Sequence, residues 1–339
     1  MKVGDLGEFG LIELLDRIVS QGTRSHVPTA HGFELLLSIG DDAAAWRSPQ
    51  GVELATTDTM VEGVHFTQDT IPWGDVGWKA IVTNLSDIAA MGGAPLYALV
   101  TIGINYRTEV EDVEQLYLGM IEACNEFQLR IIGGDIVYSP TTFITVCLTG
   151  HHISAPMTRS AAALGDLIAV TGYIGSSSAG LDLLLGEHST NDKEIGYLID
   201  CHRRPFPRLH AGQLLSKSGV KAAIDVSDGL VGDLSRFCSS SMVAARLHVD
   251  KIPVHPYLKR LLPDKWLQMA LFGGEDYELI FSGSAKLQKT ISKDSELAGQ
   301  AIIIGEMCEG DPGKVFILDS DGSELNVRGS GWDHLREKW

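Results

Sequence analysis

Cysteine is scarce in this sequence, and the cysteines present form no disulfide or metal-binding pattern. Five cysteines are scattered over 339 residues without a C-x-x-C pair, and the 11 histidines show no H-E-x-x-H spacing. A disulfide framework and a zinc site are therefore disfavoured, and reduced thiols in a cytoplasmic protein are expected. Residues 1–21 mix acidic with apolar positions, and no apolar run approaches the roughly 18 residues that cross a bilayer. We expect neither a secretory signal nor a membrane helix.

Basic residues are also few. The 27 lysines and arginines are outnumbered by 44 aspartates and glutamates, which gives a formal net charge of −17. Such a surface repels the phosphate backbone of nucleic acids and the anionic face of a membrane, so neither is expected as a partner. An acidic protein can still bind an anionic ligand when metal cations bridge the two.

The common nucleotide-binding motifs are missing. The sequence contains no G-x-x-x-x-G-K-[ST], no G-x-G-x-x-G that opens a helix, and no H-R-D paired with D-F-G. These absences disfavour the P-loop, dinucleotide-binding and protein-kinase classes. A nucleotide bound by this chain would have to be held through metal ions and backbone amides.

Length and periodicity predict two α+β domains. A chain of 339 residues suffices for about two domains of 100 to 200 residues. The apolar patterning lapses between 151 and 160, so we place the domains at 1–150 and 151–339. Helices and strands interleave without strict βα alternation, which favours the α+β class. Helices are predicted at 9–21, 75–91, 110–127, 177–185, 207–216 and 229–238, strands at 53–57, 96–104, 130–132, 143–148, 167–171, 221–224, 277–281, 301–304 and 314–318, and a hairpin turn at 319–322.

Many aspartates lie where a predicted strand or helix meets a glycine, serine or threonine. The strand 53–57 is predicted to end at Asp58, and the apolar strand 221–224 at Asp225. Magnesium prefers oxygen ligands, keeps several waters and needs only one or two carboxylates per ion. Neighbouring hydroxyls can add neutral oxygens or fix the carboxylates. We therefore expect the acids to converge on one cleft that holds several Mg²⁺ ions; the alternative is that each Gly–Asp pair is an ordinary turn.

Eight short segments, taken together, resemble thiamine-monophosphate kinase. They follow one another in order over nearly the whole chain, and their joint occurrence is far more specific than any one of them. The segments are GEF at 7–9, IGDDA at 39–43, TTDT at 56–59, GVHF at 63–66, NLSDIAAMG at 84–92, GGD at 133–135, IDVSDGL at 224–230 and GGEDYE at 273–278.

The resemblance implies a fold and a reaction. The fold is that of aminoimidazole ribonucleotide synthetase-like (PurM-like) proteins: an N-terminal α+β domain that binds ATP and magnesium and whose strands pair across a homodimer, and a C-terminal α+β domain. The reaction is transfer of a phosphoryl group from ATP to thiamine monophosphate, which gives thiamine diphosphate and ADP.

The resemblance also implies roles for individual residues. Asp228 and Arg159 would be catalytic. The nucleotide would meet Tyr117, Gly134, Asp135, Arg159 and Ser227, and the thiamine phosphate would meet His65, Glu275 and Trp332. The metal ligands would be Asp42, Thr56, Thr57, Asp58, Asp87, Asp135, Asp225 and Asp228. This chain departs from the family pattern after Asp135, where Ile136, Val137 and Tyr138 replace the two threonines and the arginine often found there.

Some of these residues also have purely structural interpretations. Arg159 could form an ion pair at the domain junction, His65 could be a packed surface residue, and Trp332 could anchor the C-terminal segment. At the level of the whole chain, the alternatives are another ATP-dependent synthetase of the same superfamily and a nucleotide-binding regulatory protein without turnover. Selenophosphate synthetases carry a reactive cysteine or selenocysteine near the N-terminus, and hydrogenase maturation factors end in a cysteine. Here the first cysteine is Cys124 and the last residue is Trp339, which disfavours these two families.

Overall fold

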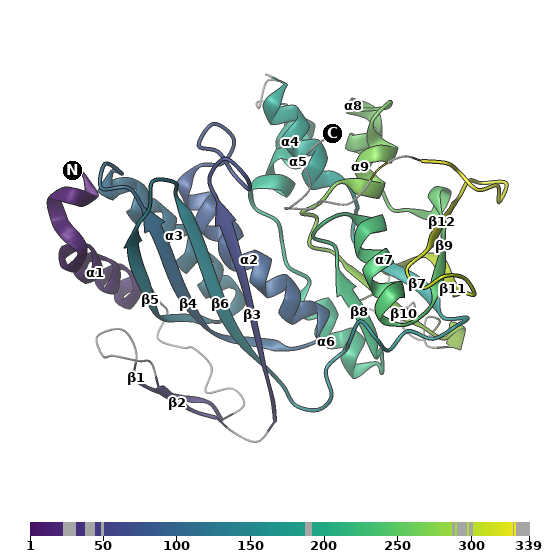
Figure 1. Ribbon diagram of the computed structural model, residues 1–339, viewed down its shortest axis with the longest axis horizontal. Helices are drawn as coiled ribbons and strands as arrows, with labels where there is room; N and C mark the ends of the chain where they lie inside the picture. Colours follow the sequence, from purple (N-terminus) through teal and green to yellow (C-terminus); the bar gives the residue numbers. More distant parts are fainter. Residues whose placement is uncertain are drawn as a thin grey trace. The chain divides into compact units, whose positions relative to one another are not determined.

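The computed structural model divides the chain into two compact units (Figure 1). Unit 1 comprises Met1–Ile88 and Ala94–Ala155, and unit 2 comprises Ala89–Gly93 and Pro156–Trp339. The structure describes residues 1–22, 32–37, 45–48, 51–186, 192–286, 289, 297, 301–327 and 329.

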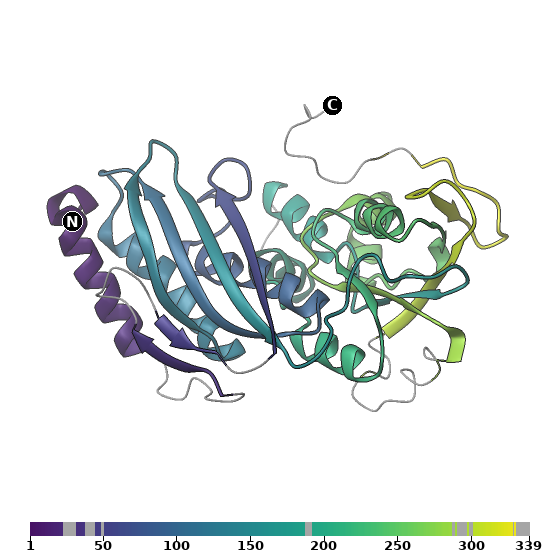
Figure 2. The ribbon, with the colours of Figure 1, turned by 60° about the horizontal axis from the view of Figure 1, so that its bottom comes forward.

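Unit 1 is a four-stranded sheet with helices on one face. The strand order is β3 (Val52–Val61), β6 (Phe143–His152), β4 (Ala94–Ile104) and β5 (Arg130–Tyr138), and all neighbours are antiparallel except β4 and β5. Helices α2 (Trp73–Ala90) and α3 (Val110–Phe127) cover the sheet (Figure 1). Helix α1 (Val3–Gly22) packs on α3 and beside β5 (Figure 2). Strands β1 (Glu34–Leu37) and β2 (Ala45–Arg47) form a separate antiparallel ribbon.

Alternation along the strands separates a buried from an exposed sheet face. In β3, Leu54 and Met60 are buried, whereas Thr57 and Thr59 are exposed. Successive side chains of a strand point to opposite faces, so the even-numbered residues of β3 face the helices. The core between sheet and helices contains the fully buried side chains of Ile81, Leu85, Ile88, Val100, Ile102, Ile144 and Val146.

Two glycines allow α2 and α3 to approach closely. A Cβ atom on Gly77 would lie 1.9 Å from the carbonyl oxygen of Leu116, and one on Gly119 would lie 1.8 Å from that of Gly74. These distances are far below van der Waals contact, so alanine at either position would push the helices apart.

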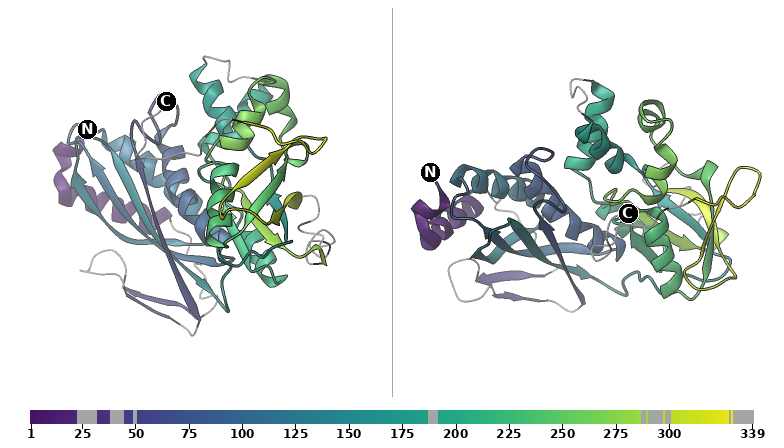
Figure 3. Two further views of the ribbon diagram at one scale, coloured as in Figure 1. Left: turned by 45° about the vertical axis from the view of Figure 1, so that its right-hand side comes forward. Right: turned by 45° about the horizontal axis from the view of Figure 1, so that its top comes forward.

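Unit 2 is a six-stranded sheet with six helices in its described ranges. The strand order is β12 (Val315–Leu318), β9 (Ala244–His248), β11 (Ala301–Cys308), β7 (Leu167–Thr171), β10 (Leu279–Gly283) and β8 (Ala222–Asp225), and only β12 and β9 are parallel. The helices are α4 (Ser176–Leu185), α5 (Lys193–Arg203), α6 (Leu209–Lys217), α7 (Leu230–Ser240), α8 (Pro256–Leu261) and α9 (Trp266–Phe272), with one turn of 3₁₀ helix at Val249–Lys251. Helices α4 and α5, drawn in teal in Figure 3, lie side by side. Leu234 and Phe237 of α7 and Leu271 of α9 are fully buried in the core.

The α+β class is confirmed, but several strand boundaries were predicted wrongly, two of them at proposed metal ligands. The predicted helices correspond to α1, α2, α3, α4, α6 and α7. Strand β3 continues to Val61 and β5 to Tyr138, so Asp58 and Asp135 lie inside strands and not at strand ends. The turn at 319–322 is confirmed, because the Asp319 carboxylate accepts hydrogen bonds from the amides of Asp321 (3.2 Å) and Ser323 (2.9 Å). In the described ranges, no helix combines the length and the apolar character that a membrane crossing requires.

Candidate active site

Among the predicted metal ligands of unit 1, Thr56 and Asp58 lie on the face of β3 that is turned to the helices, and Asp87 lies on α2. The Thr56 hydroxyl donates a hydrogen bond to the Asp87 carboxylate, which joins β3 to α2. Asp58 lies two residues along β3, so it faces the same side as Thr56, and both are half-buried. Thr57 lies on the exposed face. The structure therefore brings Thr56 and Asp87 together and separates the side chain of Thr57 from them.

Asp135 and Gly134 lie on the other edge strand. Asp135 pairs with Thr101 of β4, Thr101 pairs with Thr145 of β6, and Thr145 pairs with Thr59 of β3. Asp135 therefore lies on the exposed face of the sheet, as Thr57 does. Strands β4 and β6 separate β5 from β3. A Cβ atom on Gly134 would lie 1.9 Å from the carbonyl oxygen of Val100. Only glycine therefore permits this pairing of β5 with β4. Within unit 1, Asp135 does not join Thr56 and Asp87.

His65 and Tyr117 differ in how much of each side chain a ligand could reach. His65 is half-buried in the turn after β3, and its Nδ1 accepts a hydrogen bond from the amide of Val61 at 3.0 Å. In its neutral form this ring therefore carries its proton on Nε2. Tyr117 is only 5% exposed, and burial raises the pKa of its hydroxyl. Packing in unit 1 thus accounts for Tyr117 and leaves little of its ring for a nucleotide.

In unit 2, two of the predicted motifs lie against each other. The amide of Glu275 donates to the carbonyl of Ser227 (2.8 Å), and the amide of Tyr277 to that of Val226 (2.9 Å). Asp225 is buried at the end of β8, opposite Leu279 of β10. The segments 224–230 and 273–278 are therefore neighbours in space although 42 residues, 231–272, separate them in sequence.

An aspartate and an arginine that the sequence analysis missed hold the Ser227–Asp228 loop. The Asp233 carboxylate accepts hydrogen bonds from the amides of Ser227 (3.1 Å) and Asp228 (2.9 Å). Arg236 Nη1 lies 2.5 Å from Asp228 Oδ2 and 2.7 Å from Asp233 Oδ1. Burial raises the pKa of Asp233 to about 6. The available signal was an acid in the first turn of the helix that follows the motif.

The segment that carries Glu275 has an unusual backbone. Glu275 and Tyr277 both have positive φ angles, 67° and 51°, a conformation that costs free energy in residues other than glycine and clusters at functional sites. Glu275 Oε2 lies 3.4 Å from Nδ1 of the buried His202. Asp276, between them in sequence, accepts hydrogen bonds from the amides of Gly175 (2.6 Å) and Ser177 (3.1 Å) at the start of α4. Burial raises the pKa of Asp276 to about 7.

The remaining predicted site residues are Arg159, Asp42 and Trp332. Arg159 is exposed, and its guanidinium makes no ion pair with any residue in the described ranges. Asp42 and Trp332 lie outside the described residues.

The donor chemistry of both units suits magnesium. Among the described residues, no group of three histidine, cysteine or acidic side chains is arranged to hold a metal ion. Magnesium does not need such a group, because one or two carboxylates with waters and substrate phosphates suffice. Unit 1 offers Thr56, Asp58 and Asp87, and unit 2 offers Asp225 and Asp228. All of these are oxygen donors, which fits Mg²⁺ and disfavours softer metals.

Comparison with known proteins identifies the family. Residues 40–152 match the N-terminal domain, and residues 164–317 the C-terminal domain, of "AIR synthase related protein". The thiamine-monophosphate kinase of Bacillus subtilis is 36% identical over 91% of this chain and 96% of its own length, and that of Aquifex aeolicus is 35% identical over 99% and 100%. This chain belongs to the thiamine-monophosphate kinase family. The resemblance noted in the sequence is thereby confirmed.

Solved structures of thiamine-monophosphate kinases have the same fold. The enzyme from Stenotrophomonas maltophilia has a TM-score of 0.79 and 30% identity, covering 94% of this chain and 98% of its own. A structure described as "AaThiL complexed with AMPPCP and TMP" has a TM-score of 0.76 and 32% identity, covering 99% of both chains. The hydrogenase maturation protein HypE, with a TM-score of 0.74 and 16% identity over 95% of this chain and 97% of its own, shares the fold alone.

Proposed function

We propose that this protein transfers the terminal phosphoryl group of ATP to thiamine monophosphate, forming thiamine diphosphate and ADP in a magnesium-dependent reaction. The observation that carries the proposal is the match over 99% of the chain to a thiamine-monophosphate kinase structure described as complexed with AMPPCP and TMP. The motifs at 224–230 and 273–278, which pair in unit 2, support it.

The reaction needs positioning and charge neutralisation more than proton transfer. The second pKa of a phosphate monoester is about 6, so the attacking oxygen is already mostly anionic near neutrality and no strong general base is required. The barrier is repulsion between anions, about 4 kcal/mol for two unit charges 4 Å apart at an effective dielectric of 20. Mg²⁺ held by the carboxylates named below would supply the positive charge that offsets this repulsion.

Residues of both units have roles in this proposal. Thr56, Asp58 and Asp87 would hold magnesium in unit 1, and Asp225 and Asp228 in unit 2. Arg159 would bind the phosphate chain of ATP, because its guanidinium is exposed and makes no ion pair in the described ranges. Glu275 would face the positively charged thiazolium ring, with His65 as the second substrate contact. Thr57, Asp135, Gly134 and Ser227 keep the roles that the resemblance implies, while Asp42 and Trp332 complete the proposed set.

A single reaction mixture separates the candidate functions. We expect purified protein with ATP, Mg²⁺ and thiamine monophosphate to form thiamine diphosphate and ADP in equal amounts, and to form neither in excess chelator. Calorimetry should show that chelation also weakens ATP binding by at least tenfold, because the chain has no P-loop lysine. A synthetase would consume ATP without forming thiamine diphosphate, and a regulatory protein would bind ATP without consuming it. Equal ATP affinity in chelator would exclude the metal-dependent binding.

We also propose that the protein is a cytoplasmic homodimer. On the sheet face opposite α2 and α3, Trp46 of the β1–β2 ribbon packs on Tyr97, whereas Leu99 (40%) and Val137 (37%) on the same face are exposed. Covering such apolar side chains with a second copy would stabilise the pair through burial. All five cysteines are free thiols, which fits a reducing compartment.

The dimer is tested by mass. Sedimentation equilibrium should give the mass of two chains for the natural sequence, and Leu99→Lys should shift the population to single chains because it places a charge in the contact. Leu164→Lys, at a side chain that is 56% exposed in unit 2, is the matched control and should remain dimeric. A single-chain mass for the natural sequence at micromolar concentration would refute the proposal.

A further inference from the structure

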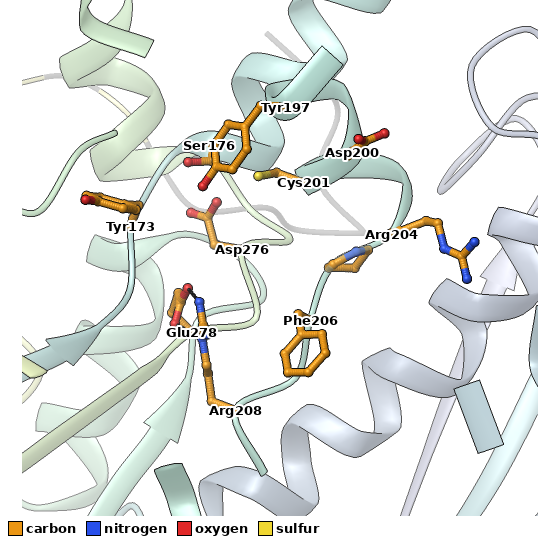
Figure 4. A pocket seen from close by; sticks show the side chains of 11 residues that line it. Tyr173, Ser176, Tyr197, Asp200, Cys201, Arg204, Phe206, Arg208, Asp276 and Glu278 are labelled. Atoms are coloured by element: carbon orange, nitrogen blue, oxygen red, sulfur yellow. Dashed lines mark hydrogen bonds and ion pairs between the residues drawn. The ribbon is translucent and has the colours of Figure 1, made fainter. Parts of the chain in front are cut away.

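Three carboxylates of unit 2, those of Asp233, Asp276 and Glu278, each accept several hydrogen bonds, and the donors show what each carboxylate does. Arg208 donates two hydrogen bonds to Glu278, from Nε to Oε2 and from Nη2 to Oε1, each 2.5 Å long. The Thr171 hydroxyl donates to Glu278 Oε2 at 2.7 Å. Figure 4 shows Arg208 and Glu278 in the wall of a pocket. Since Arg208 directly precedes α6 and Glu278 directly precedes β10, this ion pair ties the two elements together.

Asp276 holds the start of a helix. Its carboxylate accepts hydrogen bonds from the amides of Gly175 (2.6 Å) and Ser177 (3.1 Å). It lines the pocket of Figure 4 together with Ser176, the first residue of α4. The first N–H groups of a helix have no partner within the helix, and Gly175, which directly precedes α4, has no side chain to cap them. The bonds of Asp276 therefore have a sufficient explanation in the stability of α4.

Asp233 holds the loop before its own helix. Helix α7 begins at Leu230, and the side chain of Asp233, in the first turn, is 2% exposed. Its Oδ2 accepts hydrogen bonds from the amides of Ser227 (3.1 Å) and Asp228 (2.9 Å). Both amides lie ahead of the helix, so capping of α7 does not account for these bonds. A buried carboxylate is costly unless donors replace the lost water, and this one takes its donors from the loop that carries Asp228.

The same loop is held from its other side. The carbonyl of Ser227 accepts a hydrogen bond from the amide of Glu275 at 2.8 Å. Gly229 has a φ angle of 114°, and a Cβ atom on it would lie 2.8 Å from the carbonyl oxygen of Phe272. The amide and the carbonyl of Ser227 and the amide of Asp228 are therefore all bonded, which fixes the path of the backbone through the loop before a ligand arrives.

The Asp228 carboxylate keeps one oxygen for a ligand. Arg236 Nη1 lies 2.5 Å from Asp228 Oδ2 and 2.7 Å from Asp233 Oδ1. In the described ranges no residue donates to Asp228 Oδ1, and the side chain of Asp228 is 28% exposed. Magnesium is held by one or two carboxylates together with waters, and hydrogen bonds from the surrounding protein set the orientation of such ligands. Because Asp233 fixes the backbone of the loop, it also fixes the point from which the Asp228 carboxylate extends.

We propose that Asp233 is a positioning residue for magnesium, whose carboxylate holds the backbone of the Ser227–Asp228 loop so that Asp228 is oriented for the metal ion. The assignment rests on the proposed function, which places magnesium at Asp228. Asp233 acts through the two loop amides and does not touch the metal or the substrates. Arg236 has no such role, because a cation beside Asp228 repels a metal ion and does not strengthen the site.

Mn²⁺ binding to variants of Asp233 tests the assignment. Mn²⁺ prefers the same oxygen ligands as Mg²⁺, and the paramagnetic resonance signal of the free ion reports its binding without turnover. The site measured is the class of Mn²⁺ site that is lost in Asp228→Asn. Asp233→Ala removes both the charge and the bonds to the loop, and should raise the Kd of this site by about tenfold to a hundredfold. Asp233→Leu, which has nearly the shape of aspartate, replaces it if the alanine variant does not fold.

A conservative variant separates the bonds from the charge. Asp233→Asn removes the charge but keeps a carbonyl oxygen for the two amides, so it should bind Mn²⁺ at least tenfold more tightly than Asp233→Ala. Arg236→Met, at an exposed side chain, should leave Mn²⁺ binding unchanged or tighten it. Asp192→Ala is the matched control, because it removes a carboxylate that accepts from the amide of Glu194 at the start of α5. It should not change Mn²⁺ binding.

Kinetics distinguish positioning from a loss of folded protein. In Asp233→Ala the Mg²⁺ concentration for half-maximal rate should rise at least tenfold, while saturating Mg²⁺ should restore most of kcat. A merely structural role would lower kcat at every Mg²⁺ concentration and leave the Mg²⁺ requirement unchanged, which would overturn the assignment.

The outcomes also separate the positioning role from the function itself. Equal Mn²⁺ affinity in Asp233→Asn and Asp233→Ala would overturn the assignment, because the charge alone would then explain the effect. Weakened binding in Arg236→Met would overturn it as well, since the ion pair and not the loop amides would then hold the site. No loss of a Mn²⁺ site in Asp228→Asn would have the same consequence. If the natural sequence forms no thiamine diphosphate, the proposed function fails, and the Mn²⁺ dissociation constants still decide the role of Asp233.

Discussion

Asp58→Asn should lower kcat about a thousandfold or more while the protein stays folded. Asp58 lies in the middle of β3, half-buried, on the same face as Thr56, whose hydroxyl bonds to Asp87. Asparagine has nearly the same shape, so the strand pairing with Val146 is preserved. It lacks the negative charge that a magnesium ligand provides, and a loss of about 4 kcal/mol in transition-state stabilisation corresponds to a factor of about a thousand.

Metal affinity and a matched carboxylate decide whether Asp58 acts through magnesium. The concentration of Mg²⁺ that gives half-maximal rate should rise at least tenfold in Asp58→Asn, and the unfolding midpoint in urea should stay close to that of the natural protein. Glu53→Gln neutralises an exposed carboxylate on the same strand and should leave both kcat and the magnesium requirement unchanged. Near-normal turnover of Asp58→Asn at limiting Mg²⁺ would remove Asp58 from the metal set.

The position of Asp58 shows why helices were predicted better than strand ends. The apolar spacing in 75–91 has the helical period and locates α2 within two residues. Strand β3 was predicted to end at Thr57, with Asp58 directly after it. Since β3 is an edge strand with one exposed face, polar residues alternate through it and Met60 is still buried. The sequence shows this alternation but does not show which strand forms the edge.

Two elements of unit 2 illustrate different reasons for a missed prediction. Helix α5 had a readable signal, because Asp192 caps its first turn by accepting from the amide of Glu194 at 2.8 Å, and Leu198 and Ile199 are buried. Strand β9 had almost no such signal in the sequence. Its alanines and Arg246 are weak strand formers, and its position between β12 and β11 decides its conformation.

The candidate site was predictable as a set of residues and only partly as an arrangement. The pairing of the segment at Ser227 with the segment at Glu275 follows from the order of β8 and β10, which local patterns do not encode. The support that Asp233 and Arg236 give to Asp228 was missed for a different reason. An acid in the first turn of a helix normally has a sufficient explanation in the helix dipole, and only the folded chain shows that it holds a loop.

Arg208→Met should reduce the free energy of unfolding by about 3–5 kcal/mol at pH 8. Glu278 is 4% exposed, and Arg208 supplies two of the three hydrogen bonds described above for its carboxylate. Methionine fills similar space but leaves that charge buried without its partner. The measurement is urea denaturation followed by fluorescence and far-ultraviolet circular dichroism.

The pH dependence of this loss identifies its cause. Burial already raises the pKa of Glu278 above its usual 4.5, and Arg208 opposes that rise, so removing Arg208 raises the pKa further. The folded state then binds a proton more tightly than the unfolded state, and the free energy of unfolding falls as pH rises from the unfolded pKa through the folded one. The loss of unfolding free energy in Arg208→Met should therefore be smaller at pH 5 than at pH 8. Adding Glu278→Leu should recover most of this loss because no buried charge remains.

The matched control is Arg246→Met, which breaks an ion pair with Glu306 in which the two side chains are 49% and 44% exposed. This change should cost less than about 1 kcal/mol at either pH. If the two arginine variants lose equal stability, the Arg208–Glu278 pair does not have the structural role assigned to it.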